Sequence, residues 1–359
     1  MYQSANGIWA EAITLKNGKK KFFYGKTKAD VKQKMAAWSA ESEKGKTFAE
    51  IAKAWQIYHE QQTTYNTVSA YNGSFKRAVE RFGDIPLKDI TADEIQAYIT
   101  NLGNMGYARR TVQMSKNMLK MIFDYAIIQA DSEIKYNPVT AVKIPSGLSR
   151  SRRLPPKDEE IAKVKPDSEM GLFAFFLLYT GLRRGELLAL RWEDIDRVNK
   201  IIHVTKEVYY EGNEAKVKPP KTDAGIRDVD LLDILNDALP TTGTGYVFGG
   251  EKPLTRAVFT GHWAEWCRSI GLAEERTLEY TRANGAKYKM TKLKPLVTPH
   301  QFRHAYASLL DDAGLDETTA KTLLGHSSIT VTKDVYTHLR EAKRQRSASA
   351  LNDFINSKI

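Results

Sequence analysis

The sequence predicts a multidomain protein that is mainly α-helical and contains small β-sheets. Its 359 residues are enough for two or three domains with well-buried cores. Apolar residues recur at helical spacing through most of residues 47–123, whereas short runs with strand character lie near the N-terminus and between residues 201 and 231. The helical and the mixed regions are therefore expected to form separate domains.

Residues 1–45 are expected to form a small module in which a β-hairpin precedes a helix. Two strand-like runs, residues 8–15 and 20–24, flank the turn Lys16-Asn17-Gly18-Lys19. Asn-Gly between such runs is a strong hairpin signal, because both residues tolerate a positive φ. Between residues 28 and 38 the apolar spacing becomes helical.

Residues 46–142 are expected to form a helical domain of four helices. Thr47-x-x-Glu50 and Thr91-x-x-Glu94 have the pattern of a capping box at the start of a helix. Residues 143–157 form a basic linker with little periodicity. This linker is either a solvated connector or a segment that lies along DNA phosphates, and the sequence leaves both interpretations open.

The last expected domain, residues 158–359, has mixed α+β character. Helical segments are predicted at residues 173–179 and 185–190 and after Thr255, with strands at residues 201–204 and 226–231. A polar, basic insertion at residues 277–296 contains Asn284-Gly285, which could turn a hairpin, but no role follows from its sequence. The tail, residues 340–359, has a small apolar face that could pack on its own chain or on a neighbour.

The composition favours a soluble protein that binds a polyanion. Lysine and arginine number 54 against 43 acidic residues, a formal net charge of +11, which makes nucleic acid the first candidate ligand. The single cysteine, Cys267, excludes an internal disulfide and fits a cytoplasmic location. We find no signal-peptide pattern, membrane-length apolar run, phosphate-binding glycine loop or zinc-finger spacing, so neither a membrane, a cofactor nor a metal is expected.

Two segments carry residues suited to binding a phosphate oxygen. Arg183, in Thr180-Gly181-Leu182-Arg183, is expected to begin a helix beside free backbone N–H groups, and the alternative is a surface arginine paired with Glu186. His300 and Arg303 are one helical turn apart and can face one oxyanion. A zinc site using His300 and His304 is disfavoured, because Gln301 stands where a zinc protease motif requires glutamate.

Two further candidates lie near the C-terminus. A helix is expected to end at Gly325, which would expose His326 directly afterwards. Tyr336 follows in Val335-Tyr336-Thr337-His338 and is one of 17 tyrosines. Neither residue would indicate a function by itself, and a function is suggested only when all the segments are considered together.

Four motifs together resemble, in order and spacing, the tyrosine recombinase family of phage and conjugative-transposon integrases. They are Thr-Gly-Leu-Arg-Arg-Gly-Glu, Thr-Pro-His-x-x-Arg-His, Leu-Gly-His and Tyr-Thr-His. The resemblance covers most of residues 158–340 and implies a mixed α+β tyrosine recombinase catalytic domain. It implies Tyr336 as nucleophile, Arg183 and Arg303 as a phosphate clamp, and His300 and His326 as hydrogen-bonding groups. Pro220–Arg227 looks like the hairpin that carries the family's lysine, which makes Lys221 the general acid, with Lys216 and Lys218 as alternatives.

The resemblance also implies the reaction and the partners. The enzyme would cut and rejoin DNA strands through a 3′-phosphotyrosine intermediate without a metal, and would integrate or excise a prophage or conjugative transposon. It would act as a homotetramer on double-stranded DNA through a Holliday junction, with an excisionase and DNA-bending proteins as accessory partners. Residues 1–45 look like an arm-site binding module and residues 46–142 like a core-site binding domain.

Basic residues of the two N-terminal modules and the linker are the expected DNA contacts, namely Lys19, Lys20, Lys21, Lys76, Arg77, Arg109, Arg110, Lys116, Arg150, Arg152 and Arg153. Glu186 either orients the active-site groups or is a solvent-facing helix charge. A topoisomerase-like relaxing enzyme is a rival that the hairpin module disfavours. An inert DNA-binding regulator is a second rival, disfavoured because none of the catalytic residue types is missing.

Overall fold

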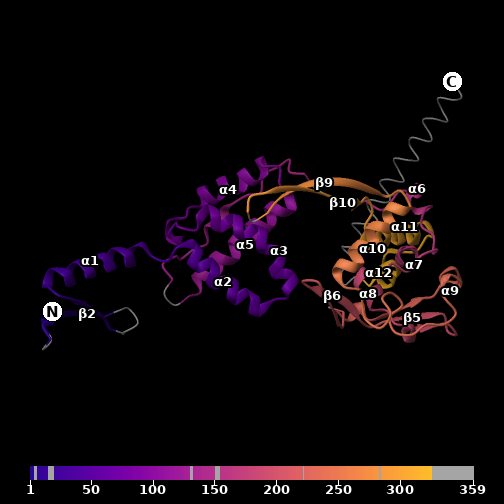
Figure 1. The fold of residues 1–359 in the computed structure, drawn as a ribbon, viewed down its shortest axis with the longest axis horizontal. Helices are drawn as coiled ribbons and strands as arrows, with labels where there is room; N and C mark the ends of the chain where they lie inside the picture. Colours follow the sequence, from indigo (N-terminus) through magenta and orange to yellow (C-terminus); the bar gives the residue numbers. More distant parts are fainter. Residues whose placement is uncertain are drawn as a thin grey trace, which may run out of the picture. The chain divides into compact units, whose positions relative to one another are not determined.

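The computed structural model describes residues 1–3, 6–14, 20–129, 132–149, 154–220, 222–282 and 284–325, with residues 39–44 described by their backbone alone. The chain divides into two compact units, Met1–Ser151 and Arg152–Ile359. Figure 1 shows the elements of each unit. Within the described ranges, no helix combines the length and the apolar character needed to cross a membrane.

The N-terminal module is a small antiparallel sheet with a helix packed against it. The strands β1 (Tyr2–Gln3), β2 (Trp9–Thr14) and β3 (Lys20–Gly25) lie in that order, and α1 (Lys28–Lys44) packs on β2 and β3. Phe23 and Val31 are buried between the sheet and the helix. The predicted strands and helix are confirmed, whereas the Lys16–Lys19 turn lies outside the described residues.

The rest of the first unit is a helical domain. Its core lies between α2 (Phe48–Gln62), α3 (Tyr65–Phe82), α4 (Ala92–Asn104) and α5 (Arg109–Ile127). The short helix η1 (Leu87–Asp89) lies between α3 and α4, and η2 (Pro138–Ala141) follows α5. Both predicted capping boxes are present at Thr47 and Thr91. Ile144 and Leu148 pack against this core, so the first half of the expected linker belongs to the helical domain by its packing.

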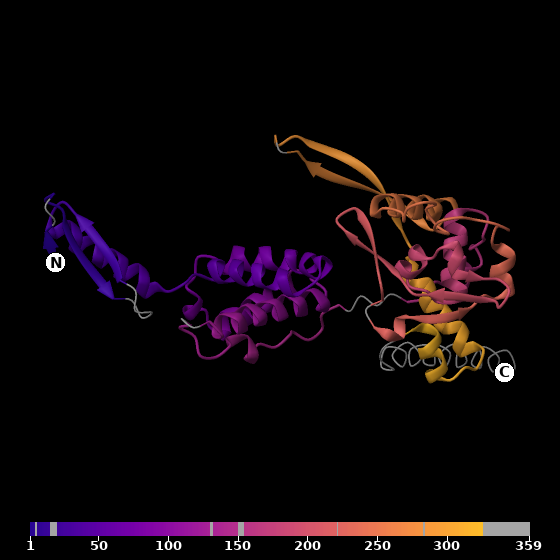
Figure 2. The same cartoon turned by 90° about the horizontal axis from the view of Figure 1, so that it is seen from below.

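The second unit is a mixed α+β domain around the apolar helix α7 (Glu169–Thr180), which is buried along most of its length. The other helical elements are α6 (Asp158–Ile161), α8 (Arg184–Ala189), η3 (Trp192–Asp194), η4 (Asp223–Gly225), α9 (Asp233–Ala238), α10 (Arg256–Ser269), α11 (Pro299–Asp312) and α12 (Glu317–Leu324). Both α10 and α11 pack against α7 (Figure 2). The buried helix predicted at residues 173–179 is therefore the centre of this domain.

The small sheets of this unit differ in one respect from the prediction. A three-stranded antiparallel sheet has the order β4 (Ile195–Asp196), β5 (Ile201–Val204), β8 (Arg227–Asp230). The separate hairpin β6 (Glu207–Glu211) and β7 (Glu214–Lys218) is inserted between β5 and β8. The hairpin predicted for residues 220–227 is therefore wrong for the described residues 222–227, because residues 223–225 form η4 and β8 pairs with β5.

The insertion at residues 277–296 is a long two-stranded ribbon. Strands β9 (Ala273–Thr281) and β10 (Lys287–Pro295) pair antiparallel over nine residues each. Gly285 adopts φ +81° at the turn, so the hairpin predicted from Asn284-Gly285 is confirmed. The ribbon is longer at its base than the sequence indicated, since β9 begins at Ala273.

Candidate active site

The end of α7 and the start of α8 place Arg183 and Glu186 side by side. Gly181 ends α7 with φ +62°, and a Cβ at this position would lie 2.2 Å from Cδ1 of Tyr306. Arg183 is the N-cap of α8, and its backbone N–H donates to Glu186 Oε2 at 2.8 Å. Its Nη1 also donates to Glu186 Oε1 at 2.6 Å. Arg183 therefore begins a helix as predicted, and it pairs with Glu186 at the same time.

Arg303 reaches the same place from α11. This helix begins at Pro299, with Thr298 as N-cap, and packs along α7. The side chain of Arg303 is only 3% exposed, and Nη1 donates to the carbonyl of Gly181. Nη1 also lies 3.9 Å from Glu186 Oε2. Arg183 and Arg303, the two arginines of the predicted clamp, are thus brought together around one carboxylate.

A third arginine, Arg227, completes the cluster, and the sequence analysis gave it no role. It begins β8, and its Nη1 and Nη2 donate to the two carboxylate oxygens of Glu186 at 3.2 and 3.0 Å. Its Nη1 also donates to the carbonyl of Gly225 at 3.2 Å. The side chain of Arg227 is 8% exposed and that of Glu186 is fully buried. Its only signal in the sequence was its place at the end of the Pro220–Arg227 segment.

The C-terminal end of α12 is attached to the same three arginines. The carbonyl of Leu323 accepts from Arg227 Nε at 3.2 Å, and that of Leu324 accepts from Arg303. The carbonyl of Gly325 accepts from Arg183 Nη2 at 2.7 Å. Carbonyls at the end of a helix have no partner within it, so these arginines satisfy groups that would otherwise need water.

The close approach explains why residue 325 is glycine. Gly325 has φ +63°, and a Cβ there would lie 2.8 Å from Nη1 of Arg227 and 3.0 Å from the carbonyl oxygen of Ala224. A larger residue would therefore push Arg227 away, in addition to straining the backbone. This contact brings Ala224 and Arg227, which follow Lys221 in the chain, to the end of α12.

The electrostatics of the cluster favour an anionic ligand. Burial alone would raise the pKa of Glu186, but Arg227, Arg183 and Arg303 together lower it to about 2, so the carboxylate is ionised at neutral pH. Burial and the charge of Arg183 lower the pKa of Arg303, although it remains protonated at pH 7. Among the described residues, three guanidiniums thus face one carboxylate, which leaves an excess of two positive charges.

The other predicted catalytic residues are placed only in part. His300 lies on the first turn of α11 at the surface, and its ring centroid is 4.5 Å from that of His304. Lys221, His326 and Tyr336 lie outside the described residues. The alternative lysines are both in ion pairs along the β6–β7 hairpin, Lys216 with Glu211 and Lys218 with Glu207.

The predicted DNA-contacting residues fall into three groups. Exposed on the surface are Lys20, Lys21, Lys76 and Arg110. Partly buried and already in contact with the protein are Arg77, stacked over the Tyr107 ring, and Lys116, which donates to the Val142 carbonyl. Arg109 is also partly buried. The third group, Lys19, Arg150, Arg152 and Arg153, lies outside the described residues.

Comparison with known proteins identifies the family. The sequence model of the phage integrase family matches residues 161–343, which is half of the chain, and the phage integrase N-terminal SAM-like domain matches residues 47–103. The chain therefore belongs to the phage integrase family of tyrosine-type, site-specific DNA recombinases. The match spans the sequence from Arg183 to Tyr336, and it favours recombination over the topoisomerase-like alternative.

Individual relatives agree with this assignment. A XerC-like tyrosine recombinase of Caldanaerobacter subterraneus is 29% identical, aligned over 94% of this chain and 93% of its own. The ICEBs1 integrase of Bacillus subtilis is 28% identical over 75% of this chain and 72% of its own length.

Solved structures share the fold. The Tn1549 transposon integrase, in complex with a circular intermediate DNA, has a TM-score of 0.63 at 20% identity and covers 84% of this chain and 99% of its own. A lambda integrase tetramer bound to a Holliday junction has a TM-score of 0.57 at 20% identity and covers 92% of this chain and 96% of its own. The mainly α fold with small sheets is therefore that of the integrases.

Proposed function

We propose that this protein exchanges DNA strands by forming a transient bond between Tyr336 and a DNA phosphate. The tyrosine oxygen would attack the phosphorus, the bond to the 5′-oxygen would break, and a 3′-phosphotyrosine with a free 5′-hydroxyl would result. A 5′-hydroxyl from another strand would then reverse the step and release Tyr336. The phosphoester bond energy is retained throughout, so rejoining needs no further energy source.

The observation that supports this proposal most directly is the arginine cluster around Glu186. Negative charge develops on the phosphate oxygens in the transition state, and pre-positioned guanidiniums stabilise it. Arg183 is 38% exposed and offers its remaining N–H groups to such an oxygen. Arg303 is buried, and two of its five N–H groups donate to the carbonyls of Gly181 and Leu324, so a direct contact with DNA would use its other N–H groups.

The remaining roles follow from the family. Lys221 would protonate the departing 5′-oxygen, and His300 would accept the phenolic proton of Tyr336, with His326 as a further hydrogen-bond donor to the phosphate. Glu186 and Arg227 would act by holding Arg183 and Arg303 in place. None of these steps requires a metal ion.

The biological setting is proposed on the same basis. We infer integration and excision of a prophage or conjugative transposon in a bacterial cytoplasm, with residues 1–45 on arm sites and residues 46–142 on core sites. A homotetramer on a Holliday junction is supported by the similarity to the lambda integrase tetramer. An excisionase and DNA-bending proteins would be accessory partners.

The experiment is to trap the covalent intermediate. The protein is incubated in EDTA with nicked duplexes that carry candidate attachment sites, and the product is separated on a denaturing gel. We expect a protein–DNA adduct with the wild type and with Tyr136→Phe, which removes the hydroxyl of an exposed tyrosine that is 78% accessible. Tyr336→Phe should give none. An adduct that persists in Tyr336→Phe refutes the assignment, and DNA binding without any adduct favours the inert regulator.

A further inference from the structure

The β9–β10 ribbon has no part in the proposed chemistry, yet its two faces are very different. It starts beside α10 and projects away from the rest of the second unit (Figure 2). Its strands pair from Ala273 opposite Pro295 to Thr281 opposite Lys287. Because successive side chains of a strand point to opposite faces, this register assigns each residue to one face.

One face, which we call the cationic face, collects the basic and aromatic residues. It carries the opposed pairs Glu274 and Lys294, Arg276 and Lys292, Leu278 and Met290, and Tyr280 and Tyr288. The neutral face carries Glu275 and Leu293, Thr277 and Thr291, Glu279 and Lys289, and Thr281 and Lys287. The cationic face has three positive side chains against one negative, whereas the neutral face has two of each.

The aromatic pair holds cations over the cationic face. The rings of Tyr280 and Tyr288 stack with centroids 5.5 Å apart. Nζ of Lys292 lies 5.0 Å from the Tyr280 centroid, and the guanidinium of Arg282 lies 5.2 Å from the Tyr288 centroid. A side-chain hydrogen bond with Tyr280 raises the pKa of Lys292 above its ordinary value.

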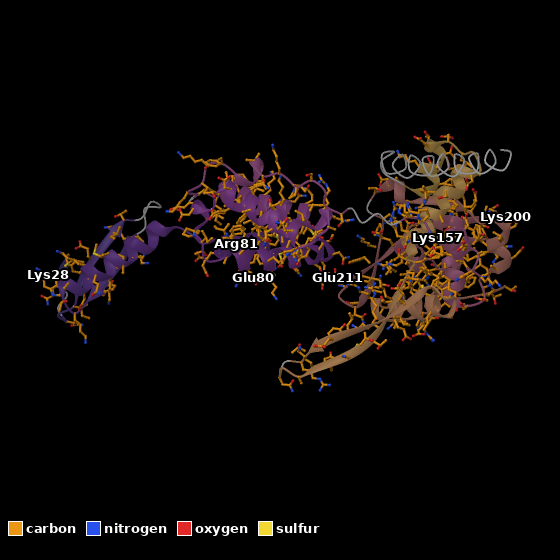
Figure 3. The ribbon with its side chains drawn as sticks, turned by 90° about the horizontal axis from the view of Figure 1, so that it is seen from above. Lys28, Glu80, Arg81, Lys157, Lys200 and Glu211 are labelled. Carbon is orange, nitrogen blue, oxygen red and sulfur yellow. The ribbon has the colours of Figure 1, made fainter. Side chains whose placement is uncertain are left out.

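The charges of the neutral face are instead used within the ribbon. Lys287 pairs with Glu279 at 3.1 Å, and Lys289 stands directly opposite Glu279. On the cationic face, Glu274 lies 3.5 Å from Arg276 and stands directly opposite Lys294, so one carboxylate faces three cations. The unbalanced charge of the ribbon is therefore directed to one side (Figure 3 shows side chains along its length).

We propose that the cationic face of the β9–β10 ribbon binds the phosphate backbone of duplex DNA. A two-stranded ribbon fits a DNA groove, and lysine, arginine and tyrosine side chains are common donors to phosphate oxygens. A protein partner fits less well, because the aliphatic side chains of this face are only Leu278 and Met290, which are 43% and 41% exposed. The contact would lengthen the DNA footprint without taking part in strand cleavage.

The proposal rests on the proposed function only for the identity of the ligand. Its test therefore uses the Tyr336→Phe protein, in which no strand is cut, and a random-sequence duplex several helical turns long. The test variant is Arg276→Gln with Lys292→Gln, and the matched control is Lys287→Gln with Lys289→Gln. Each removes two positive charges from the same exposed ribbon, so the net charge of the protein falls equally in both.

Affinity is measured by fluorescence anisotropy over a series of salt concentrations. Two lost phosphate contacts should lower the slope of log affinity against log salt by about two and weaken binding by up to about 60-fold at 0.1 M salt. The control should keep the parental slope. Equal losses in the two variants refute the proposal, since they would reflect net charge alone.

A different result would point to a protein partner and would also overturn the proposal. In that case the cationic-face variant would bind DNA as the parent does, but would sediment as a smaller assembly on the duplex. Failure of the proposed chemistry is recognised separately, because it abolishes the covalent adduct of the wild type while leaving the difference between the two ribbon variants intact.

Discussion

Replacing Arg227 with alanine removes the guanidinium that donates to both carboxylate oxygens of the fully buried Glu186. The pKa of Glu186 is about 2 in the folded protein against an ordinary value of 4.5. At about 1.4 kcal/mol per pH unit, this depression corresponds to about 3 kcal/mol of stability at neutral pH. In other proteins, removing one partner of a buried ion pair lowers the free energy of unfolding by about 3–5 kcal/mol. We therefore expect Arg227→Ala to lose at least about 3 kcal/mol in the second unit.

The pH dependence of stability can show that the loss in Arg227→Ala comes from Glu186. Because the folded-state pKa of Glu186 is depressed, its contribution is complete above the ordinary value of 4.5 and is lost as the pH falls toward about 2. Between pH 7 and pH 3 this group should cost the parent about 2 kcal/mol. In Arg227→Ala the pKa of Glu186 rises, so most of that acid-dependent loss should disappear.

The measurement is urea-dependent hydrogen exchange of peptides from α7 and α8, which reports the second unit by itself. The control is Lys200→Ala, which removes the cation of a surface pair with Asp233, 58% and 76% exposed, at the edge of the same unit (Figure 3). That pair should be worth less than about 1 kcal/mol. If Arg227→Ala costs no more than Lys200→Ala, or keeps the parental acid dependence, Arg227 does not support Glu186.

Three further outcomes follow from the same structure. Gly181→Ala should destabilise the second unit by more than about 1 kcal/mol, because Gly181 has a positive φ and lies close to the Tyr306 ring. Gly261→Ala, where a Cβ would meet open space, should stabilise α10 slightly, and thermal unfolding compares the two variants. Arg183→Lys keeps the charge but loses the planar fork, so the single-turnover rate of adduct formation should fall about a hundredfold, and a parental rate would remove Arg183 from the clamp. Burial raises the pKa of Cys267 to about 12, so a thiol reagent at pH 8 should label it only after unfolding, and rapid native labelling would contradict its burial.

Local signals predicted the helical part of the fold well. The capping boxes at Thr47 and Thr91 need only side chains within one turn of their own backbone, and both form. Asn284-Gly285 likewise encodes its turn locally. The two-residue strand β1 could not be predicted, because so short a segment has no periodicity and depends on β2 for its pairing.

The connection between β5 and β8 shows why the hairpin was predicted at the wrong residues. Strand pairing is a contact between distant residues, and the alternating runs at residues 201–204 and 226–231 gave no indication that they pair with each other. The prediction therefore assigned a hairpin to residues 220–227, where the chain forms η4 before it enters β8. The inserted β6–β7 hairpin occupies the connection instead.

The site was predictable where a motif places its residues within one or two turns. Arg183 and Glu186 are three positions apart, and the start of α8 joins them directly. Arg227 contacts Glu186 from 41 positions away and Leu323 from 96 positions away. A single arginine at the start of a strand carries no sign of such partners, so only the folded structure assigns it to the site.

The end of α12 is where the arginine cluster and the segment carrying the proposed nucleophile are joined. Carbonyls at a helix C-terminus carry partial negative charge, and the guanidiniums of Arg227, Arg303 and Arg183 each bind one of three in succession. The chain then continues from Gly325 to His326 and on to Tyr336. In the proposed function a DNA phosphate would bind further N–H groups of Arg183 and Arg303. Binding of the substrate would then be linked to the hold on the end of α12, because the same two guanidiniums would take part in both.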